Sequence, residues 1–264
     1  MSAGTTFLQD RFERKARTIN ALLIRELMAR FGHRNIGFLW QVLEPLLLTL
    51  GVMISWSTVY GERNHGVRVI PLVLTGYTFI TVWRHMNSRF LHAFRHGSGL
   101  LFHRQVRPAD ILVARGLLES VGTLIAFFVA YLPLRLLDVI EPVDDYLLLL
   151  SGWSLLCLFS FGVAMILSAL AHFSDAFERV IQPIMYLILP LTGAFYMVYW
   201  LPPSARQIVM WSPLVNASEM FRAGYFGAEV PTTWNWPYLA IWTIAVNAVG
   251  WLLVLKAQRH IELE

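Results

Sequence analysis

The sequence has few charged residues, and this scarcity excludes most soluble folds. Asp, Glu, Lys and Arg make up 14% of its 264 residues, whereas 56% are hydrophobic. A soluble domain carries about a quarter charged residues, because it needs polar groups to cover its surface. The mean hydropathy of +0.55 agrees. An integral membrane protein is therefore predicted, and neither disorder nor nucleic-acid binding is expected despite the net charge of +4.

Cysteine and lysine are nearly absent as well. Cys157 is the single cysteine and lies in an apolar run, which excludes a disulfide framework and a Cys-based zinc site. The two lysines, Lys15 and Lys256, do not follow a glycine, so a G-x-x-x-x-G-K phosphate-binding loop is missing. H-E-x-x-H and G-x-S-x-G are missing too. We expect no catalytic, cofactor or metal site in this chain, and no cleavable signal peptide, because no apolar run precedes residue 38.

Six apolar stretches are long enough to cross a bilayer, whose core of about 30 Å needs roughly 20 apolar residues in a helix. None alternates as a barrel strand would. The expected spans cover residues 38–60, 70–85, 111–137, 146–171, 180–200 and 236–255.

Basic residues near the span ends predict the orientation, because cytoplasmic loops carry an excess of Lys and Arg. Fifteen fall on one side, mostly in the N-terminal segment and the loop after the second span, and five on the other. Both termini are therefore expected to face the cytoplasm. The predicted fold is an all-α integral membrane protein with a single transmembrane domain over residues 1–264. It comprises a cytoplasmic N-terminal segment at 10–35, a six-span bundle at 36–256 and a cytoplasmic tail at 257–264.

Two segments are expected to lie outside the spans on the cytoplasmic side. The pattern of apolar and charged residues at 17–34 predicts an amphipathic helix in the membrane interface. The apolar face is expected to comprise Leu23, Ile24, Leu27, Met28 and Phe31, with Leu22 off this face. The loop at 89–110 is basic and also carries the apolar residues 100–102, as a short helix that projects toward a cytoplasmic partner would.

The segment between the fifth and sixth spans contains short apolar stretches interrupted by prolines. Stretches of about ten apolar residues suit re-entrant or interfacial helices. Such a segment lies at membrane depth only where protein or a water-filled cavity covers it. Short re-entrant periplasmic helices are therefore expected before the last span.

Two carboxylates fall within the spans. Glu44 lies beside Pro45 at the entry to the first span, and Glu119 is expected to pair with Arg115 one turn away. An ion-coupled carrier usually needs ionisable groups in mid-membrane. We interpret both carboxylates as structural rather than proton-carrying, so transport would need an outside energy source.

Several motifs resemble those of a known family. Residues 22–46 follow the pattern L-x-x-R-E-x-x-x-R-F-G-x-x-x-x-G-x-x-W-x-x-x-E-P-L, a second match covers 99–119, and a third covers 212–215. The pattern resembles permease subunits of type-2 ABC exporters that move polysaccharides. Capsular-polysaccharide export permeases are the nearest match, with O-antigen and teichoic-acid permeases as relatives, and the similarity extends over essentially the whole chain.

The resemblance implies a homodimer that docks two separate ATP-binding subunits, which would bind ATP and magnesium in place of this chain. The N-terminal helix and the loop at 89–107 would contact those subunits, and re-entrant helices would close the pore outside. Pro183, Pro190 and Gly193 would kink the fifth span. The residues implied in ATPase coupling are Arg25, Glu26, Arg30, Arg95, His96, Leu100, Phe102, Arg104 and Arg107. Those implied in the periplasmic gate are Ser212, Pro213, Glu219 and Arg222.

A sugar polymer offers hydroxyls and apolar ring faces, so its path is expected to combine aromatic and polar side chains. The candidates are Trp40, Glu44, Trp56, Tyr60, Trp83, Arg84, Arg89, Tyr196, Tyr199 and Trp200. Trp and Tyr also gather at membrane interfaces without touching substrate. Arg84 and Arg89 equally fit the inside-positive rule or contacts to anionic lipid headgroups.

The sequence thus favours the membrane subunit of an ATP-driven exporter in the bacterial inner membrane, which carries lipid-linked capsular polysaccharide outward. Export proteins of the periplasm and outer membrane, and membrane lipids, are further expected partners. Three alternatives stay open: a type-2 exporter of O-antigen, teichoic acid, a drug or a lipid, a membrane-embedded transferase acting on lipid-linked sugar, and a passive channel.

Overall fold

The computed structural model describes residues 2–31, 36–91, 93 and 107–261. Within them the chain is almost entirely helical. The helices are α1 (Ser2–Phe31), α2 (Ile36–Tyr60), α3 (Val69–Leu91), α6 (Pro108–Leu136), α7 (Tyr146–Phe173), α8 (Asp175–Ile188), α9 (Pro203–Val209), α10 (Pro213–Phe226) and α11 (Trp236–Ile261). Short 3-10 turns are η1 (Leu189–Thr192), η2 (Val198–Trp200) and η3 (Gly227–Glu229). The strands β1 (Arg63–Asn64) and β2 (Val67–Arg68) form an antiparallel hairpin between α2 and α3.

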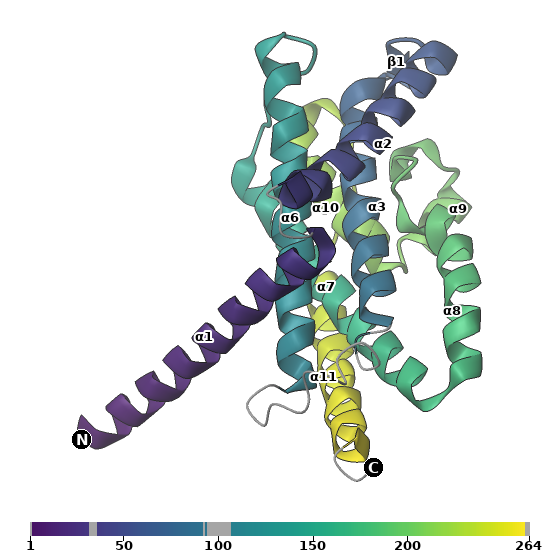
Figure 1. Cartoon of the computed structure of the whole chain (residues 1–264). Helices are drawn as coiled ribbons and strands as arrows, with labels where there is room; N and C mark the ends of the chain where they lie inside the picture. Colours follow the sequence, from purple (N-terminus) through teal and green to yellow (C-terminus); the bar gives the residue numbers. More distant parts are fainter. Residues whose placement is uncertain (1, 32–35, 92, 94–106, 262–264) are drawn as a thin grey trace.

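Helix α7 lies at the centre of the bundle and packs along α11, α10 and α3, while α3 also contacts α6 and α2. Figure 1 shows α1 leaving the bundle at an angle, with the C-terminus at the lower end and the β-hairpin at the upper end. We call the end with the C-terminus and the start of α6 the terminal end, and the opposite end the hairpin end.

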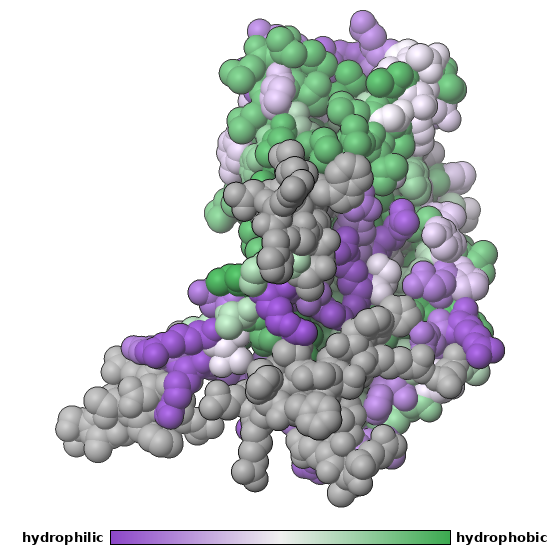
Figure 2. Space-filling view, in the orientation of Figure 1, coloured by the Kyte–Doolittle hydropathy of each residue, from purple (hydrophilic) through white to green (hydrophobic). Residues whose placement is uncertain are grey.

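Three described helices are long and apolar enough to cross a membrane. They are Pro108–Leu136, Tyr146–Phe173 and Trp236–His260, with mean hydropathies of 1.8, 2.2 and 1.9. They coincide with the expected third, fourth and sixth spans. The described apolar part of α2, Leu46–Tyr60, is shorter. Figure 2 shows hydrophobic side chains over most of the upper part, whereas hydrophilic ones gather lower down and along α1.

The expected fifth span is wrong as a single helix. α8 begins at Asp175, where the Oγ of Ser174 accepts a hydrogen bond from the backbone N–H of Phe177, and it ends at Ile188. Pro183 lies inside α8, whereas Pro190 belongs to η1 and Gly193 has a φ of 76°. Because glycine adopts positive φ without a Cβ penalty, the chain turns here and leaves the helix rather than kinking.

The core lies where α3, α6, α7 and α10 meet. α10 is buried along almost its whole length, and the ring of Phe221 lies 5.6 Å from that of Phe127 and 5.8 Å from that of Trp153. Aromatic pairs at such separations add to the stabilisation from area burial. α10 is therefore an internal helix, which holds the residues near 219–222 inside protein rather than at its surface.

Candidate functional site

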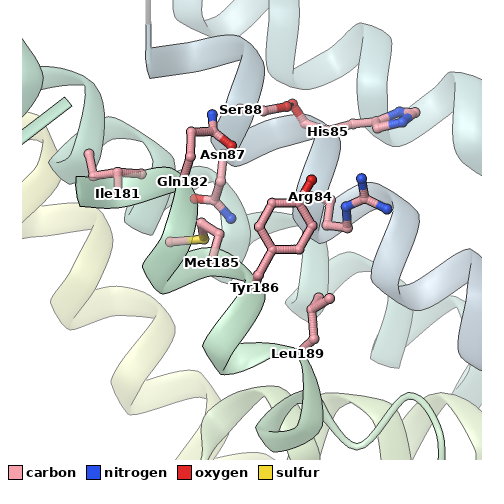
Figure 3. A pocket seen from close by; sticks show the side chains of 9 residues that line it. All are labelled: Arg84, His85, Asn87, Ser88, Ile181, Gln182, Met185, Tyr186 and Leu189. Atoms are coloured by element: carbon pink, nitrogen blue, oxygen red, sulfur yellow. The ribbon is translucent and has the colours of Figure 1, made fainter. Parts of the chain in front are cut away.

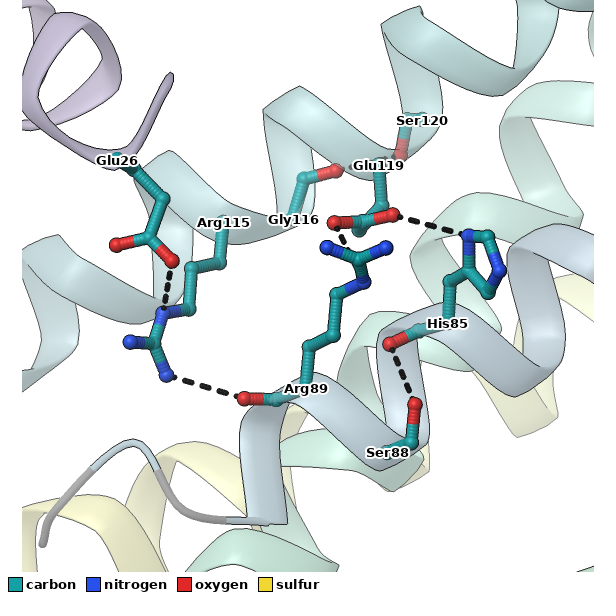
Figure 4. A network of polar contacts seen from close by, with 8 residues as sticks. All are labelled: Glu26, His85, Ser88, Arg89, Arg115, Gly116, Glu119 and Ser120. Carbon is teal, nitrogen blue, oxygen red and sulfur yellow. Dashed lines mark hydrogen bonds and ion pairs between the residues drawn. The ribbon is translucent and has the colours of Figure 1, made fainter. Parts of the chain in front are cut away.

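Side chains from α1, α3 and α6 form one polar network near the terminal end of the bundle (Figure 4). The Nε of Arg115 donates to the Oε1 of Glu26 at 2.9 Å, and its Nη1 donates to the backbone carbonyl of Arg89 at 3.0 Å. The Nε of Arg89 lies 3.3 Å from the Oε1 of Glu119. The Nδ1 of His85 lies 3.4 Å from the Oε2 of Glu119. We call Glu26, His85, Arg89, Arg115 and Glu119 the three-helix network.

Helical spacing explains how the network forms. His85 and Arg89 are four residues apart on α3, as are Arg115 and Glu119 on α6, so each pair lies on one face of its helix. Because the two helices pack together, the two faces meet. Arg115 also supplies a donor to a carbonyl in the last turn of α3, where intrahelical donors run out. The network therefore links α1 to α3 through α6.

The expected pairing of Glu119 with Arg115 on the same helix is wrong. Arg115 instead reaches Glu26 on α1, and Glu119 faces Arg89 and His85 on α3. The Glu119 side chain is fully buried, whereas 28% of the Arg89 side chain is exposed. A buried carboxylate needs such partners, because losing one costs about 3–5 kcal/mol.

A second set of contacts docks α1 on the first turns of α6. The Nζ of Lys15 lies 2.6 Å from the Oδ1 of the buried Asp110. The Oδ2 of Asp110 accepts a hydrogen bond from the backbone N–H of Arg107 at 3.3 Å, which caps α6. Leu22 packs against Ile111 and Ala114. α1 is thus held by an ion pair and an apolar contact, in addition to Glu26.

The expected apolar face of the N-terminal helix is confirmed only in part, because Leu23 packs on α6 whereas other members of that face do not. Leu22, which was expected off that face, is only 7% exposed, whereas Ile24 and Met28 are each 49% exposed. The docking face is formed by Ile19, Leu22 and Leu23. The helix also begins at Ser2, well before the expected residue 17. Helical spacing places Leu22 in line with Lys15, about two turns before it, and with Glu26, about one turn after it.

The residues expected to couple to an ATPase are only partly within the described chain. Glu26 belongs to the three-helix network, Arg25 is exposed beside it, and Arg107 is exposed at the start of α6. Outside the described residues lie Arg95, His96, Leu100, Phe102, Arg104 and the side chain of Arg30.

The residues expected on a substrate path come from α2, α3 and the segment after α8. Trp83 is 3% exposed and stacks on Phe159, so the structure places it in the core instead. Trp56 lies near Tyr60, with ring centroids 5.4 Å apart. Glu44 is half-buried, and the side chain of Trp40 lies outside the described residues.

Three further candidates for that path follow α8. The hydroxyl of Tyr199 donates to the backbone carbonyl of His65 at 3.0 Å, and Trp200 stacks on the His65 ring at 4.9 Å. These contacts tie η2 to the β-hairpin. The Tyr196 side chain is half-buried, and its backbone carbonyl accepts a hydrogen bond from Arg222. Arg84 is exposed on α3.

The residues expected in a periplasmic gate are brought together, but in the interior. The guanidinium of Arg222 donates to the carbonyls of Gly193, Ala194 and Tyr196 at 2.6–2.7 Å. The carboxylate of Glu219 accepts from the backbone N–H groups of Val198 and Thr233 at 3.2 and 2.9 Å. Arg222 and Glu219 are each 1% exposed. We call these two residues and their backbone partners the buried clamp.

The buried clamp provides hydrogen-bond partners for backbone groups of the segment 193–198, which is not part of an α-helix or a sheet. Burial raises the pKa of the Glu219 carboxyl, while the backbone donors and Arg222 act in the opposite direction. At the start of α10, the hydroxyl of Ser212 donates to the carbonyl of Leu191 at 3.3 Å. Pro213 occupies the first turn of α10, where its missing N–H costs nothing. Both residues position the clamp without contributing to it.

Sequence reasoning did not assign Lys15, His85, Asp110 or Arg115 to this site. A signal was present, because Arg115 is a lone cation inside an apolar stretch and such groups are expensive there. His85 lies at the end of the apolar stretch before the loop at 89–110, and Asp110 lies at the start of the apolar stretch after it. Their mutual contacts, however, depend on how α1, α3 and α6 pack.

Comparison with known proteins places these features in context. A model of the family described as "ABC-2 type transporter" matches residues 17–226. The capsule polysaccharide export inner-membrane protein BexB of Haemophilus influenzae is 34% identical over 258 residues, which cover 98% of this chain and 97% of BexB. The corresponding protein CtrC of Neisseria meningitidis serogroup B is 33% identical over 246 residues, 93% of each chain.

A more distant relative is the polysialic acid transport protein KpsM of Escherichia coli. It is 25% identical over 242 residues, which cover 90% of this chain and 93% of KpsM. The family match includes α1 from residue 17, the three-helix network and the buried clamp except its backbone partner Thr233.

Proposed function

Because this chain belongs to the ABC-2 type transporter family, we propose that it is the membrane subunit of an ATP-driven exporter of capsular polysaccharide. The observation that carries the proposal is its similarity, over nearly the full length of both chains, to two inner-membrane proteins of capsule export. The polysaccharide, which we take to be lipid-linked, would move from the cytoplasm to the periplasm. Family membership also favours a permease over a transferase or a passive channel.

The proposed topology has six spans with both termini in the cytoplasm. α6, α7 and α11 supply three spans, α2 and α3 supply two, and α8 with η1 supplies the remaining one. At about 1.5 Å per residue, the 14 residues of α8 are too short to cross a core of about 30 Å. The segment through η1 and η2 would complete this crossing, and α9 and α10 would be the re-entrant helices.

The energy would come from two separate ATP-binding subunits. Lys15 and Lys256, the two lysines of this chain, do not follow glycine, so it lacks the loop that cradles nucleotide phosphates in such ATPases. We propose that α1 and the connection between α3 and α6 receive the movement of those subunits. The three-helix network supports this role, since it joins α1 to the ends of α3 and α6 that flank this connection.

We propose that the permease is a homodimer. Apolar side chains on α2 and α8 are exposed, among them Ile54 at 66%, Val59 at 72% and Leu187 at 75%. In a membrane, such faces meet either lipid or another copy of the chain. A dimer built on α2 and α8 would enclose a path between the two copies, from which periplasmic and outer-membrane export proteins would receive the polysaccharide.

A gene deletion with complementation tests the proposal. Deleting the gene should abolish surface capsule while glycan accumulates inside the cell, and the wild-type gene should restore display only when its ATPase partner is intact. Loss of O-antigen or teichoic acid with normal capsule would assign the exporter to that substrate instead. Normal surface glycan of every kind after deletion would overturn the proposal.

A further inference from the structure

A cleft of about 60 Å³ opens between α3 and α8 (Figure 3). α3 contributes Arg84, His85, Asn87 and Ser88, and α8 contributes Gln182 and Tyr186 among others. Figure 3 shows the guanidinium of Arg84 beside the ring of Tyr186, with the amides of Asn87 and Gln182 on the other side of the cleft. Both walls therefore carry polar side chains, although each belongs to a helix that we place in the membrane, and Ile181, Met185 and Leu189 add an apolar part to the wall formed by α8 and the start of η1.

The cleft carries positive charge without a matching carboxylate. None of the residues that line it is Asp or Glu. Arg84 is exposed, its guanidinium carbon lies 5.9 Å from the centroid of the Tyr186 ring, and it makes no ion pair within the described part of the chain. Arg89, which follows on the same helix, is instead neutralised by Glu119. An unpaired cation beside an aromatic face favours an anionic ligand.

Asn87 provides a second, independent observation. It is 1% exposed, and its Nδ2 donates to the backbone carbonyl of Trp83 at 2.8 Å. Its Oδ1 accepts no hydrogen bond from any residue that the structure describes. Buried polar atoms almost always have a partner, so a ligand that donates a hydrogen bond, such as a hydroxyl, would complete this side chain.

We propose that the cleft between α3 and α8 binds an acidic sugar unit of the exported glycan. The anionic group would lie at Arg84, the apolar ring face on Tyr186, and a hydroxyl would donate to Asn87. Exposure of Tyr186 at 59% leaves its ring accessible to such a ligand. This inference rests on the proposed function and adds to it the place in the fold where an acidic unit of the polymer is held.

Binding to the purified permease in nanodiscs of neutral lipid tests the assignment, with an oligomer of four galacturonic acid units as the probe and the neutral galactose tetramer as its counterpart. The wild type should bind the acidic tetramer about tenfold more tightly, as one charge-assisted hydrogen bond predicts. Arg84→Gln should remove that preference and leave the neutral tetramer unaffected, whereas Arg84→Lys should retain part of it. Asn87→Leu should weaken both tetramers alike, because both carry hydroxyls.

Arg63→Gln removes one exposed charge on the β-hairpin, away from the cleft, and should behave as the wild type. Equal affinity of the wild type for both tetramers, or an unchanged preference in Arg84→Gln, would overturn the assignment. Displacement of the acidic tetramer by phosphatidylglycerol would do so as well, since the site would then serve a lipid headgroup. The proposed function fails separately, if capsule display survives deletion of the gene.

Discussion

Arg222 is a long charged side chain that is almost completely buried, with 1% of its surface exposed. An ionised group in such a place needs hydrogen-bond partners. The Nη1 and Nη2 of Arg222 donate to three carbonyls of the loop 193–196, whereas its Nε has no partner among the described residues. Glu219, one turn earlier, accepts from two further backbone N–H groups. Arg222 and Glu219 thus hold backbone groups that lack partners in an α-helix or a sheet.

Arg222→Met should therefore destabilise the protein strongly. It would remove the donors to the carbonyls of Ala194 and Tyr196, whereas the carbonyl of Gly193 would keep the hydroxyl of Ser218. Glu219 would also lose the cation one turn away, and together these losses cost about 3–5 kcal/mol. The melting temperature of the purified protein in detergent would measure this loss. Arg206→Met is the matched control, because that side chain is half-buried and bonds to two carbonyls, which predicts a loss of about 1 kcal/mol. Equal melting temperatures of the two variants would contradict the clamp.

Gly76 shows at the same scale why α3 approaches this loop so closely. A Cβ added there would overlap the carbonyl of Ala194 and lie 2.9 Å from the Nη2 of Arg222. Gly76→Ala should cost about 1–3 kcal/mol through overpacking, seen as a lower melting temperature. Gly51→Ala on α2 is the control, since a Cβ there meets nothing within 4 Å. That variant should gain about 0.5–1 kcal/mol of helix propensity, and a similar response of both variants would rule out the close approach.

At the scale of elements, α1 is the helix whose position most affects the proposed coupling. It leaves the bundle at an angle in Figure 1 and is held to α6 by Lys15, Leu22 and Glu26. An element held by a few side chains opens at a lower free energy than the core. This makes α1 a suitable receiver for movement of an ATP-binding subunit.

Glu26→Gln should lower the rate of ATP-driven export while leaving membrane insertion intact. It exchanges the half-buried ion pair with Arg115 for a neutral contact, which costs about 1–3 kcal/mol of docking between α1 and α6. Capsule display and stimulation of the partner's ATP hydrolysis are the two readouts. Arg17→Gln breaks the exposed pair with Glu13 on the same helix, worth less than about 1 kcal/mol, and should be near-neutral. Wild-type export by Glu26→Gln would remove the network from the coupling mechanism.

At the scale of the whole molecule, the proposed topology is open to direct labelling. Cys157 is the single cysteine and is buried, so Cys157→Ala provides a background without reactive thiols. A membrane-impermeant maleimide should label Arg63→Cys in intact spheroplasts, whereas Arg259→Cys should react only after the membrane is permeabilised. Both positions are exposed, so access to the probe depends on the side of the membrane. The reverse labelling pattern would invert the orientation.

The proposed homodimer predicts a protein mass of twice 30.2 kDa by detergent-corrected light scattering. Exposed apolar side chains on α2 and α8 provide the surface for it. Replacing Ile54 and Leu187 with Lys should reduce that mass, because a charge in an apolar interface is costly to bury. Leu136→Lys is the control at an equally exposed apolar position, near the end of α6. A single-chain mass for the wild type would contradict the dimer.

The sequence by itself determined the membrane class and the positions of α6, α7 and α11, because hydropathy and helix length are local properties. Family membership was likewise contained in the motifs at residues 22–46 and 99–119. Local rules failed at residues 180–200, where apolar composition predicted one helix and Gly193, at positive φ, marks a turn instead. They also failed at Leu22, whose burial depends on the neighbouring α6 rather than on the helix's own pattern.

Only the tertiary structure decided which charges meet. Spacing favoured Arg115 with Glu119, yet Arg115 pairs with Glu26, which is 89 residues away along the chain. Arg222 likewise finds its acceptors 26–29 residues earlier. A charge within an apolar helix must find a partner, and this much is evident from composition. The partner itself is decided by how the helices cross, because the residues that meet at a crossing are distant in the sequence.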